Sequence, residues 1–170
     1  VLVDDPVHQV KVLRELDQIG YRGPEPAAPY AADAYFELHI EQGPFLEREH
    51  KQIGIVTGAQ AQVWYDIVTT GQDSHAGTTP PSTRKDALVA AARIIEAVDR
   101  IMRARGDDGR GTVGQLQVFP NSRNVVPGEV RFSAEFRHPS MDEVNRMDEE
   151  FQAEARRLAE KDGVQLDLTV

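Results

Sequence analysis

The sequence predicts an α+β fold of the ferredoxin-like type, a two-layer sandwich with two helices on one face of a four-stranded antiparallel sheet. Three observations predict it. Strand-like and helix-like segments follow one another in the order β-α-β-β-α-β from residue 58 to residue 170. Both helical segments carry an apolar stripe, and the clearest strand is apolar on one side only. A chain of 170 residues is also long enough to bury such a core without disulfides.

Residues 1–57 are predicted to form a segment of their own. Residues 5–23 have the apolar spacing of a short helix, which Gly20 or Gly23 ends. The apolar positions are Val7, Val10, Leu13 and Leu16. A proline-rich connector over residues 24–33 follows.

The remainder of this segment leads to a domain boundary. Residues 34–40 alternate like a strand, and Pro44 opens a short helix. The apolar, glycine-flanked stretch after it suits a crossing strand or a hinge. We therefore place the boundary near Thr57, which gives a segment 1–57 and a domain 58–170.

The first half of the domain is predicted to be strand, helix, strand. Residues 62–71 alternate and are rich in β-branched and aromatic side chains, which favours a strand. Residues 83–103 predict an amphipathic helix, opened by a capping box of Thr83 and Asp86. Its apolar face comprises Leu88, Ala91, Ile95, Val98 and Met102. Residues 112–120 predict the second strand.

The second half repeats this order. Residues 129–137 form a strand with an apolar face of Val130, Phe132, Ala134 and Phe136, and an open polar face of Arg131, Ser133, Glu135 and Arg137. Ser140 is the expected N-cap of the second helix, with Glu143 reaching back to it, and Gly163 ends this helix. Its stripe comprises Val144, Met147, Phe151 and Leu158. Residues 164–170 predict the last strand.

Composition limits the possible functions. The 19 basic and 28 acidic residues give a net charge of −9, which disfavours nucleic acid as a partner. The absence of cysteine excludes disulfides and thiolate metal sites and favours a cytoplasmic setting. No apolar run reaches the length of a membrane span. Because the first residue is Val1 rather than methionine, we expect a fragment of a longer protein.

Four polar residues at predicted strand ends could carry chemistry, and each has an alternative structural role. His39 is either a metal ligand or an ordinary hydrogen-bonded histidine. His75 could donate to a developing oxyanion, or its loop could merely satisfy backbone groups. Asn124 is either a substrate contact or a turn residue. Arg137 could hold a carboxylate in a bidentate pair, or it is a solvated charge at a strand end.

Three stretches together are similar to one family. They are "ELHIEQGP", "SHAGTTP" and "NVVPG" followed by "FRH". In this order they resemble the metal-dependent amidohydrolases of the N-carbamoyl-L-amino-acid hydrolase, allantoate amidohydrolase and β-ureidopropionase group. This group belongs to the clan of aminoacylases and carboxypeptidase-like metallopeptidases. The resemblance covers nearly the whole chain from Tyr35 onward.

The resemblance implies a two-domain enzyme that hydrolyses a small ureido or amide substrate. Its catalytic domain would carry two divalent ions, which are zinc, manganese, cobalt or nickel. A ferredoxin-like domain inserted into it would serve as lid and as the contact of a homodimer. Residues 1–57 then correspond to part of the α/β catalytic domain and residues 58–170 to the lid.

The resemblance also implies roles for single residues. The position of His39 is a metal ligand, and the position of His75 reaches across the dimer to steady the oxyanion of the tetrahedral intermediate. The positions of Gln62, Asn124 and Arg137 contact substrate. We expect His75, Asn124 and Arg137 to gather on one rim of the second domain.

Other ligands of the family and its glutamate base have no counterpart in this chain. We therefore expect the isolated chain to be inactive and to bind no structural metal, because three or more ligands must converge. The alternative is a stand-alone ferredoxin-like dimerisation or binding module without catalysis. A third possibility is a peptidase or deacylase of the same clan, which the string "HIEQGP" disfavours.

Overall fold

The computed structural model describes residues 12–25 and 31–170. The chain divides into two compact units, Val1–Gly54 and Ile55–Val170. The boundary that we place near Thr57 from the sequence stays a prediction. None of the described helices has the length and apolar character that crossing a membrane requires.

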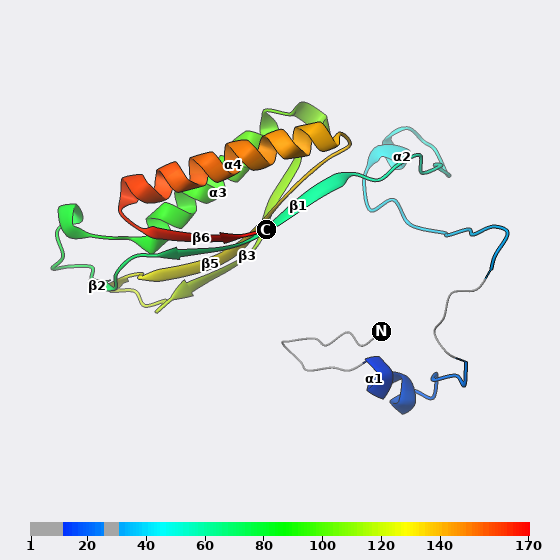
Figure 1. Cartoon of the computed structure of the whole chain (residues 1–170), viewed down its shortest axis with the longest axis horizontal. Coiled ribbons are helices and arrows are strands. Elements are labelled where there is room, and N and C mark those ends of the chain that lie inside the picture. Colours follow the sequence, from blue (N-terminus) through cyan, green and yellow to red (C-terminus); the bar gives the residue numbers. More distant parts are fainter. Residues whose placement is uncertain (1–11, 26–30) are drawn as a thin grey trace. The chain divides into compact units, whose positions relative to one another are not determined.

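The second unit has the ferredoxin-like fold that the sequence predicts. Its six main elements are β1 (Ala61–Thr70), α3 (Ala87–Arg103), β3 (Arg110–Phe119), β5 (Glu129–His138), α4 (Met141–Asp162) and β6 (Gln165–Thr169). The strands lie in the order β3-β5-β1-β6, and every neighbouring pair is antiparallel. Both helices cover the same face of this sheet (Figure 1).

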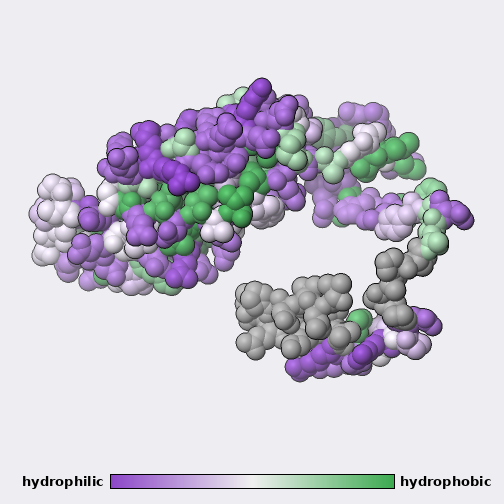
Figure 2. Space-filling view, viewed as in Figure 1, coloured by the Kyte–Doolittle hydropathy of each residue, from purple (hydrophilic) through white to green (hydrophobic). Residues whose placement is uncertain are grey.

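The core lies between the sheet and the two helices. β1 and β5 pair over their whole length, from Ala61 opposite His138 to Thr70 opposite Glu129. This pairing aligns the alternating apolar side chains of both strands on the helix side. They are Tyr65, Ile67, Val130, Phe132, Ala134 and Phe136, all buried. The surface of α3 and α4 that faces away from the sheet is mostly hydrophilic (Figure 2).

Three aromatic rings fill the centre of this core. The ring centroids of Tyr65 and Phe151 lie 4.9 Å apart, and Phe136 lies 5.3 Å from Phe151 and 6.2 Å from Tyr65. The Tyr65 hydroxyl donates to Asp148 Oδ1 on α4 at 2.5 Å. Burial of Tyr65, and then its bond to the Asp148 carboxylate, raise the pKa of this tyrosine. Tyr65 is therefore neutral and ties β1 to α4.

The start of α3 differs from the expected capping box. Asp86 alone caps the helix, because its Oδ1 accepts from the backbone N–H groups of Leu88 and Val89 at 3.0 Å each. Thr83 lies in a short 3₁₀ turn, Pro81–Thr83, and its hydroxyl donates to the Pro80 carbonyl. After this turn the backbone of Arg84 is extended, so α3 begins only after Asp86 and Thr83 lies too early in the chain to cap it.

The start of α4 also lacks the expected box. Ser140 is at the N-cap position, but its side chain makes no capping hydrogen bond. The Glu143 carboxylate instead accepts from Arg146 at 2.5 Å and lies 3.7 Å from Arg105. Charged guanidinium groups therefore hold this carboxylate in place of the weaker backbone donor.

The buried residues of α4 match the apolar stripe predicted from the sequence, whereas those of α3 match it only in part. On α4, the predicted residues Val144, Met147, Phe151 and Leu158 are all buried. On α3, Ala91 and Val98 are buried, whereas Leu88, Ile95 and Met102 are only partly buried at the margin of the core. The centre of the α3 stripe is Ala87, Ala90, Ala91, Ile94, Ala97, Val98 and Ile101. Small alanine side chains let this helix approach the sheet closely, and hydrophobicity alone does not reveal them.

The first unit is less regular than the sequence suggests. α1 (Val12–Gln18) confirms the described part of the first predicted helix, whose Val7 and Val10 lie outside the described residues. Gly20 follows with φ of +69°, as expected for a helix end. α2 (Phe45–Arg48) follows Pro44, also as expected.

The strand predicted over residues 34–40 is wrong for the structure described, because this segment forms no strand. Its apolar side chains are exposed, with Leu38 fully accessible and Phe36 93% exposed. A strand needs a neighbour for its backbone groups, and no described segment of the first unit supplies one. Hydrophobic residues also lie on the surface around α2 (Figure 2).

Gly71, at the exit of β1, offers a test of this packing. A Cβ at this position would lie 2.0 Å from the Lys85 carbonyl oxygen. We expect Gly71→Ala to lower the free energy of unfolding of the chain by about 1–3 kcal/mol, because the backbone must shift. Gly114→Ala is the matched control, since its Cβ meets nothing within 4 Å. Equal denaturation midpoints for the two variants would contradict this close approach.

Candidate functional site

His75 and Asn124 lie side by side at one end of the sheet. After β1, the chain forms β2 (Ser74–His75), which pairs with β4 (Val125–Val126) and places His75 opposite Val125. The N–H of Ala76 donates to the Asn124 carbonyl at 2.8 Å. β2 lies beyond the end of the main sheet (Figure 1). The two loops that carry His75 and Asn124 are thus joined by backbone hydrogen bonds.

The backbone fixes the tautomer of His75. Its Nδ1 accepts a hydrogen bond from the Gly77 N–H at 3.0 Å. Because a backbone N–H can only donate, Nδ1 carries the lone pair, and the neutral ring has its proton on Nε2. The side chain is exposed. His75 therefore presents an N–H donor to solvent or to a ligand.

Asn124 adds a second donor of the same kind. Its Oδ1 accepts from the Ser122 hydroxyl at 3.0 Å, which leaves the amide NH₂ as the outward group. Within residues 12–25 and 31–170, no acceptor binds this NH₂. An exposed imidazole N–H and an amide N–H₂ at one corner suit an oxygen that gains negative charge.

Arg84 holds the loop that carries His75, a role that sequence reasoning missed. Its Nε donates to the Thr79 carbonyl at 2.9 Å and its Nη2 to the Ala76 carbonyl at 2.7 Å. No ion pair joins it to a carboxylate in the described part of the chain, so the loop keeps this positive charge. Nothing in the sequence distinguishes an arginine that binds carbonyls of its own loop from a solvated one.

Gln62 and Arg137 form a second group at the opposite end of the sheet. They are cross-strand partners on β1 and β5, on the face away from the helices. The Arg137 guanidinium donates to Glu135 Oε2 from Nε at 2.9 Å and from Nη2 at 2.7 Å. Its Cζ also lies 5.5 Å from the centroid of the Trp64 ring.

The expectation that His75, Asn124 and Arg137 gather on one rim is therefore wrong. β5 extends from Glu129, next to the His75 end, to Arg137, which is about 26 Å of extended strand. The sequence places Asn124 and Arg137 on either side of one strand, and a straight strand keeps its two ends apart. One domain thus carries two candidate half-sites, one of His75 and Asn124 and one of Gln62 and Arg137.

His39, in the first unit, has the opposite tautomer to His75. Its Nδ1 lies 2.6 Å from the Ile40 carbonyl oxygen. Since a carbonyl can only accept, Nδ1 donates the proton and Nε2 keeps a lone pair. Histidines that bind metal ions usually donate their other N–H in this way. The exposed His39 ring is therefore suited to supply one ligand to a metal ion.

Glu41, next to His39, has a structural role instead. Its two carboxylate oxygens accept from the backbone N–H groups of Phe45 and Leu46 at 3.0 Å each, which caps α2. Among residues 12–25 and 31–170, no three His, Asp or Glu side chains gather closely enough to hold a metal ion. Any complete metal site at His39 would need ligands from outside these described residues.

Comparison with known proteins identifies the second unit. Residues 57–163 match the peptidase dimerisation domain family. The chain belongs to this family. The match covers β1 to α4 with both half-sites.

Individual members of known families are similar over most of the chain. N-carbamoyl-L-amino-acid amidohydrolase of Rhizobium meliloti is 43% identical over 150 residues, which are 88% of this chain and 36% of that protein. Allantoate amidohydrolase of Bacillus subtilis is 43% identical over 62% of this chain and 26% of that protein. A crystal structure of a hydantoinase/carbamoylase family amidase from Burkholderia vietnamiensis has a TM-score of 0.86 and 46% identity, covering 96% of this chain and 40% of that one. The chain thus spans well under half the length of these relatives.

The loop that carries His75 allows a test of the Arg84 contacts. We expect Arg84→Ala in the 170-residue chain to speed amide hydrogen exchange at Ala76 and Thr79 by about 10- to 100-fold, because two hydrogen bonds to carbonyl groups are lost. Arg103→Ala is the control, since among the described residues Arg103 pairs only with Asp99, on the outer side of α3. Unchanged exchange at Thr79 in the Arg84 variant would show that the loop is held by other contacts.

Proposed function

We propose that this chain is the lid and dimerisation part of a metal-dependent hydrolase that cleaves the ureido C–N bond of N-carbamoyl-L-amino acids or of a related ureido acid. The observation that carries the proposal is the pair of opposite histidine tautomers. The Nε2 lone pair of His39 suits a metal ligand, and the Nε2–H of His75 suits an oxyanion donor. The relatives named above act on substrates of this class by their names.

His75 acts in this proposal as the catalytic donor. When water adds to the ureido carbon, the carbonyl oxygen gains negative charge. The Nε2–H of His75 donates to this oxygen, and a preorganised donor of this kind typically contributes about 100- to 1000-fold to kcat. The NH₂ of Asn124, beside it, adds a second hydrogen bond to the substrate. Hydrolysis of a carbamoyl amino acid then yields carbon dioxide, ammonia and the amino acid.

Arg137 and Gln62 bind the other end of the substrate. A guanidinium and a carboxylate form a bidentate, charge-assisted pair, which suits the carboxylate that all candidate substrates share. Gln62, directly across the strand pair from Arg137, can donate and accept beside it. This half-site therefore selects acids over neutral ureas.

His39 would hold one of the divalent ions, which are zinc, manganese, cobalt or nickel in this proposal. Such ions, when bound, activate a water molecule and polarise the carbonyl group. The remaining ligands would come from parts of the protein outside the described residues. We propose that these parts also cover the exposed apolar side chains of residues 34–40. The cytoplasmic location expected from the lack of cysteine stays a prediction.

The separation of the two half-sites implies that one active site uses both of them only through a dimer. The ureido group and the carboxylate of an N-carbamoyl amino acid lie within about 5 Å of each other. The half-sites lie at opposite ends of a ten-residue strand. In a symmetric homodimer, His75 and Asn124 of one copy can serve the active site that uses Arg137 and Gln62 of the other.

A mixture of two inactive variants tests this arrangement in the full-length enzyme that carries the chain. His39→Ala removes the metal ligand, and His75→Ala removes the oxyanion donor. If His75 acts in the partner's site, a mixed dimer has one intact site. Co-refolding the two variants in equal amounts should then restore about a quarter of wild-type ammonia release, since half of the random dimers are mixed.

The controls are each variant refolded alone, and size-exclusion chromatography to show that all samples form dimers. Activity of the mixture no higher than that of the single variants would mean that both histidines act within one chain. A monomeric active enzyme would refute the dimer as well.

Removal of the metal tests the reaction class. We expect a chelator to abolish ammonia release by the full-length enzyme, and zinc, manganese, cobalt or nickel to restore it, because the ions activate the water. The 170-residue chain alone should release no ammonia under any of these conditions. Undiminished activity after dialysis against the chelator would exclude this class of hydrolase. A panel of carbamoyl amino acids, allantoate and N-acyl amino acids would separate ureido hydrolysis from peptidase or deacylase activity.

A further inference from the structure

The guanidinium of Arg137 is held from two directions. Glu135 lies two residues earlier on the same face of β5, and both hydrogen bonds from Arg137 end on one of its oxygens, Oε2. Trp64, the cross-strand partner of Glu135, places its ring 5.5 Å from the guanidinium carbon. Glu135 is the more buried member of the ion pair, with 17% of its side chain exposed against 38% for Arg137.

These contacts leave one edge of the guanidinium open. Arginine has five N–H donors in a planar fork, and Glu135 takes one from Nε and one from Nη2. The two donors of Nη1 and the second donor of Nη2 remain, and no acceptor binds them within the described part of the chain. The Nη1–Nη2 edge is therefore free for a bidentate carboxylate.

A second arginine lies on the strand next to Arg137. Arg110, on β3, is the other cross-strand partner of Arg137. Its guanidinium is turned to the backbone, where it donates to the carbonyl groups of Asp107 and, at 2.9 Å, Gly109. Arg110 thus adds a positive charge on the strand beside Arg137, while Asp107 and Asp108 lie in the turn that precedes Arg110.

We propose that Glu135 is a positioning residue that, together with Trp64, fixes Arg137 so that its Nη1–Nη2 edge meets the substrate carboxylate. This inference rests on the proposed function. Glu135 could instead compete with the substrate for Arg137, but its bonds occupy only the Nε–Nη2 edge of the guanidinium. Because Arg137 is ordered before the substrate arrives, binding does not carry the entropy cost of immobilising its side chain. The site is partly exposed, so solvent screens the repulsion between Glu135 and the substrate carboxylate and this gain in affinity is retained.

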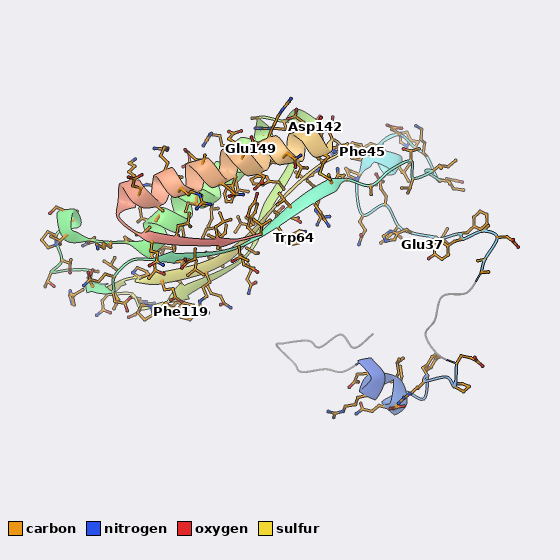
Figure 3. All side chains as sticks on the ribbon, viewed as in Figure 1. Glu37, Phe45, Trp64, Phe119, Asp142 and Glu149 are labelled. Atoms are coloured by element: carbon orange, nitrogen blue, oxygen red, sulfur yellow. The ribbon has the colours of Figure 1, made fainter. Side chains whose placement is uncertain are left out.

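A second ion pair on the same strand provides a matched control. Arg131 Nε donates to Glu129 Oε1 at 2.8 Å, and the Arg131 guanidinium carbon lies 5.5 Å from the Phe119 ring. Glu129 and Arg131 thus repeat the spacing and the aromatic contact of Glu135 and Arg137. Trp64 and Phe119 both lie on the sheet side away from the helices (Figure 3). The two pairs differ in place, because only Arg137 lies opposite Gln62.

Steady-state kinetics of the full-length enzyme test the proposal. We expect Glu135→Ala to raise the KM of an N-carbamoyl amino acid by about 3- to 10-fold, the cost of immobilising one flexible side chain, with little change in kcat. Glu135→Gln should restore most of the affinity, because the amide oxygen still accepts from Arg137. Glu129→Ala should leave KM unchanged. For the carboxamide analogue of the substrate, KM should be the same in the wild type and in every variant.

The outcomes separate this inference from the proposed function. A KM that falls, or that rises equally in the Glu129 variant or for the carboxamide, overturns the positioning role of Glu135. A wild-type enzyme that hydrolyses no ureido acid refutes the proposed function instead.

A spectroscopic readout does not depend on hydrolysis. In the ¹⁵N-labelled 170-residue chain, the Arg137 Nε–H signal should exchange slowly in the wild type and in Glu135→Gln, and rapidly in Glu135→Ala. Equal exchange rates of the Arg137 Nε–H in the wild type, Glu135→Gln and Glu135→Ala would overturn the inference. This measurement does not require an active enzyme.

Discussion

The pairing of β1 with β5 over ten residues is the constraint on which the rest of the domain depends. Its register aligns the apolar side chains of both strands beneath α3 and α4, and it aligns the polar ones on the open face. A shift by one residue would reverse both faces, so burial of the apolar set fixes the register strongly. The same register sets Gln62 beside Arg137 and Trp64 beside Glu135. Core packing and the arrangement of Gln62, Trp64, Glu135 and Arg137 on the open face thus have a single cause.

Backbone hydrogen bonds decide what each histidine can do. An N–H group from Gly77 and a carbonyl group from Ile40 set opposite tautomers in His75 and His39. Both contacts are local in sequence, so the chain encodes an Nε2–H donor at His75 and an Nε2 lone pair at His39 without long-range packing. The two hydrogen bonds from Arg84 to the Thr79 and Ala76 carbonyls then hold the loop that carries His75.

The length of β5 explains why a dimer suits this architecture. A strand that is long enough to cross the core also carries its two ends far apart, so polar groups at both ends cannot meet around one small molecule. Two-fold symmetry brings opposite ends of two copies together without any change of fold. In the proposed enzyme, dimerisation is therefore a condition of catalysis and adds more than stability.

The sequence by itself determined the order of the elements, the apolar face of β5 and the stripe of α4, because strand alternation and helical spacing are local patterns. Three short strings, around His39, around His75 and between Asn124 and His138, also resemble the group of N-carbamoyl-L-amino-acid and allantoate amidohydrolases. Residues 57–163 match the peptidase dimerisation domain family. Only the tertiary structure decided the alanine-centred face of α3, the Arg84 and Glu135 contacts, and the separation of Asn124 from Arg137. The face of α3 and the separation of Asn124 from Arg137 depend on how segments remote in sequence pack and on the direction in which a strand extends. The Arg84 and Glu135 contacts are local in sequence, but they depend on side-chain directions that the residue pattern does not reveal. The strand expected over residues 34–40 is absent for a related reason: alternation is local, whereas a strand also needs a neighbouring strand to bind its backbone groups.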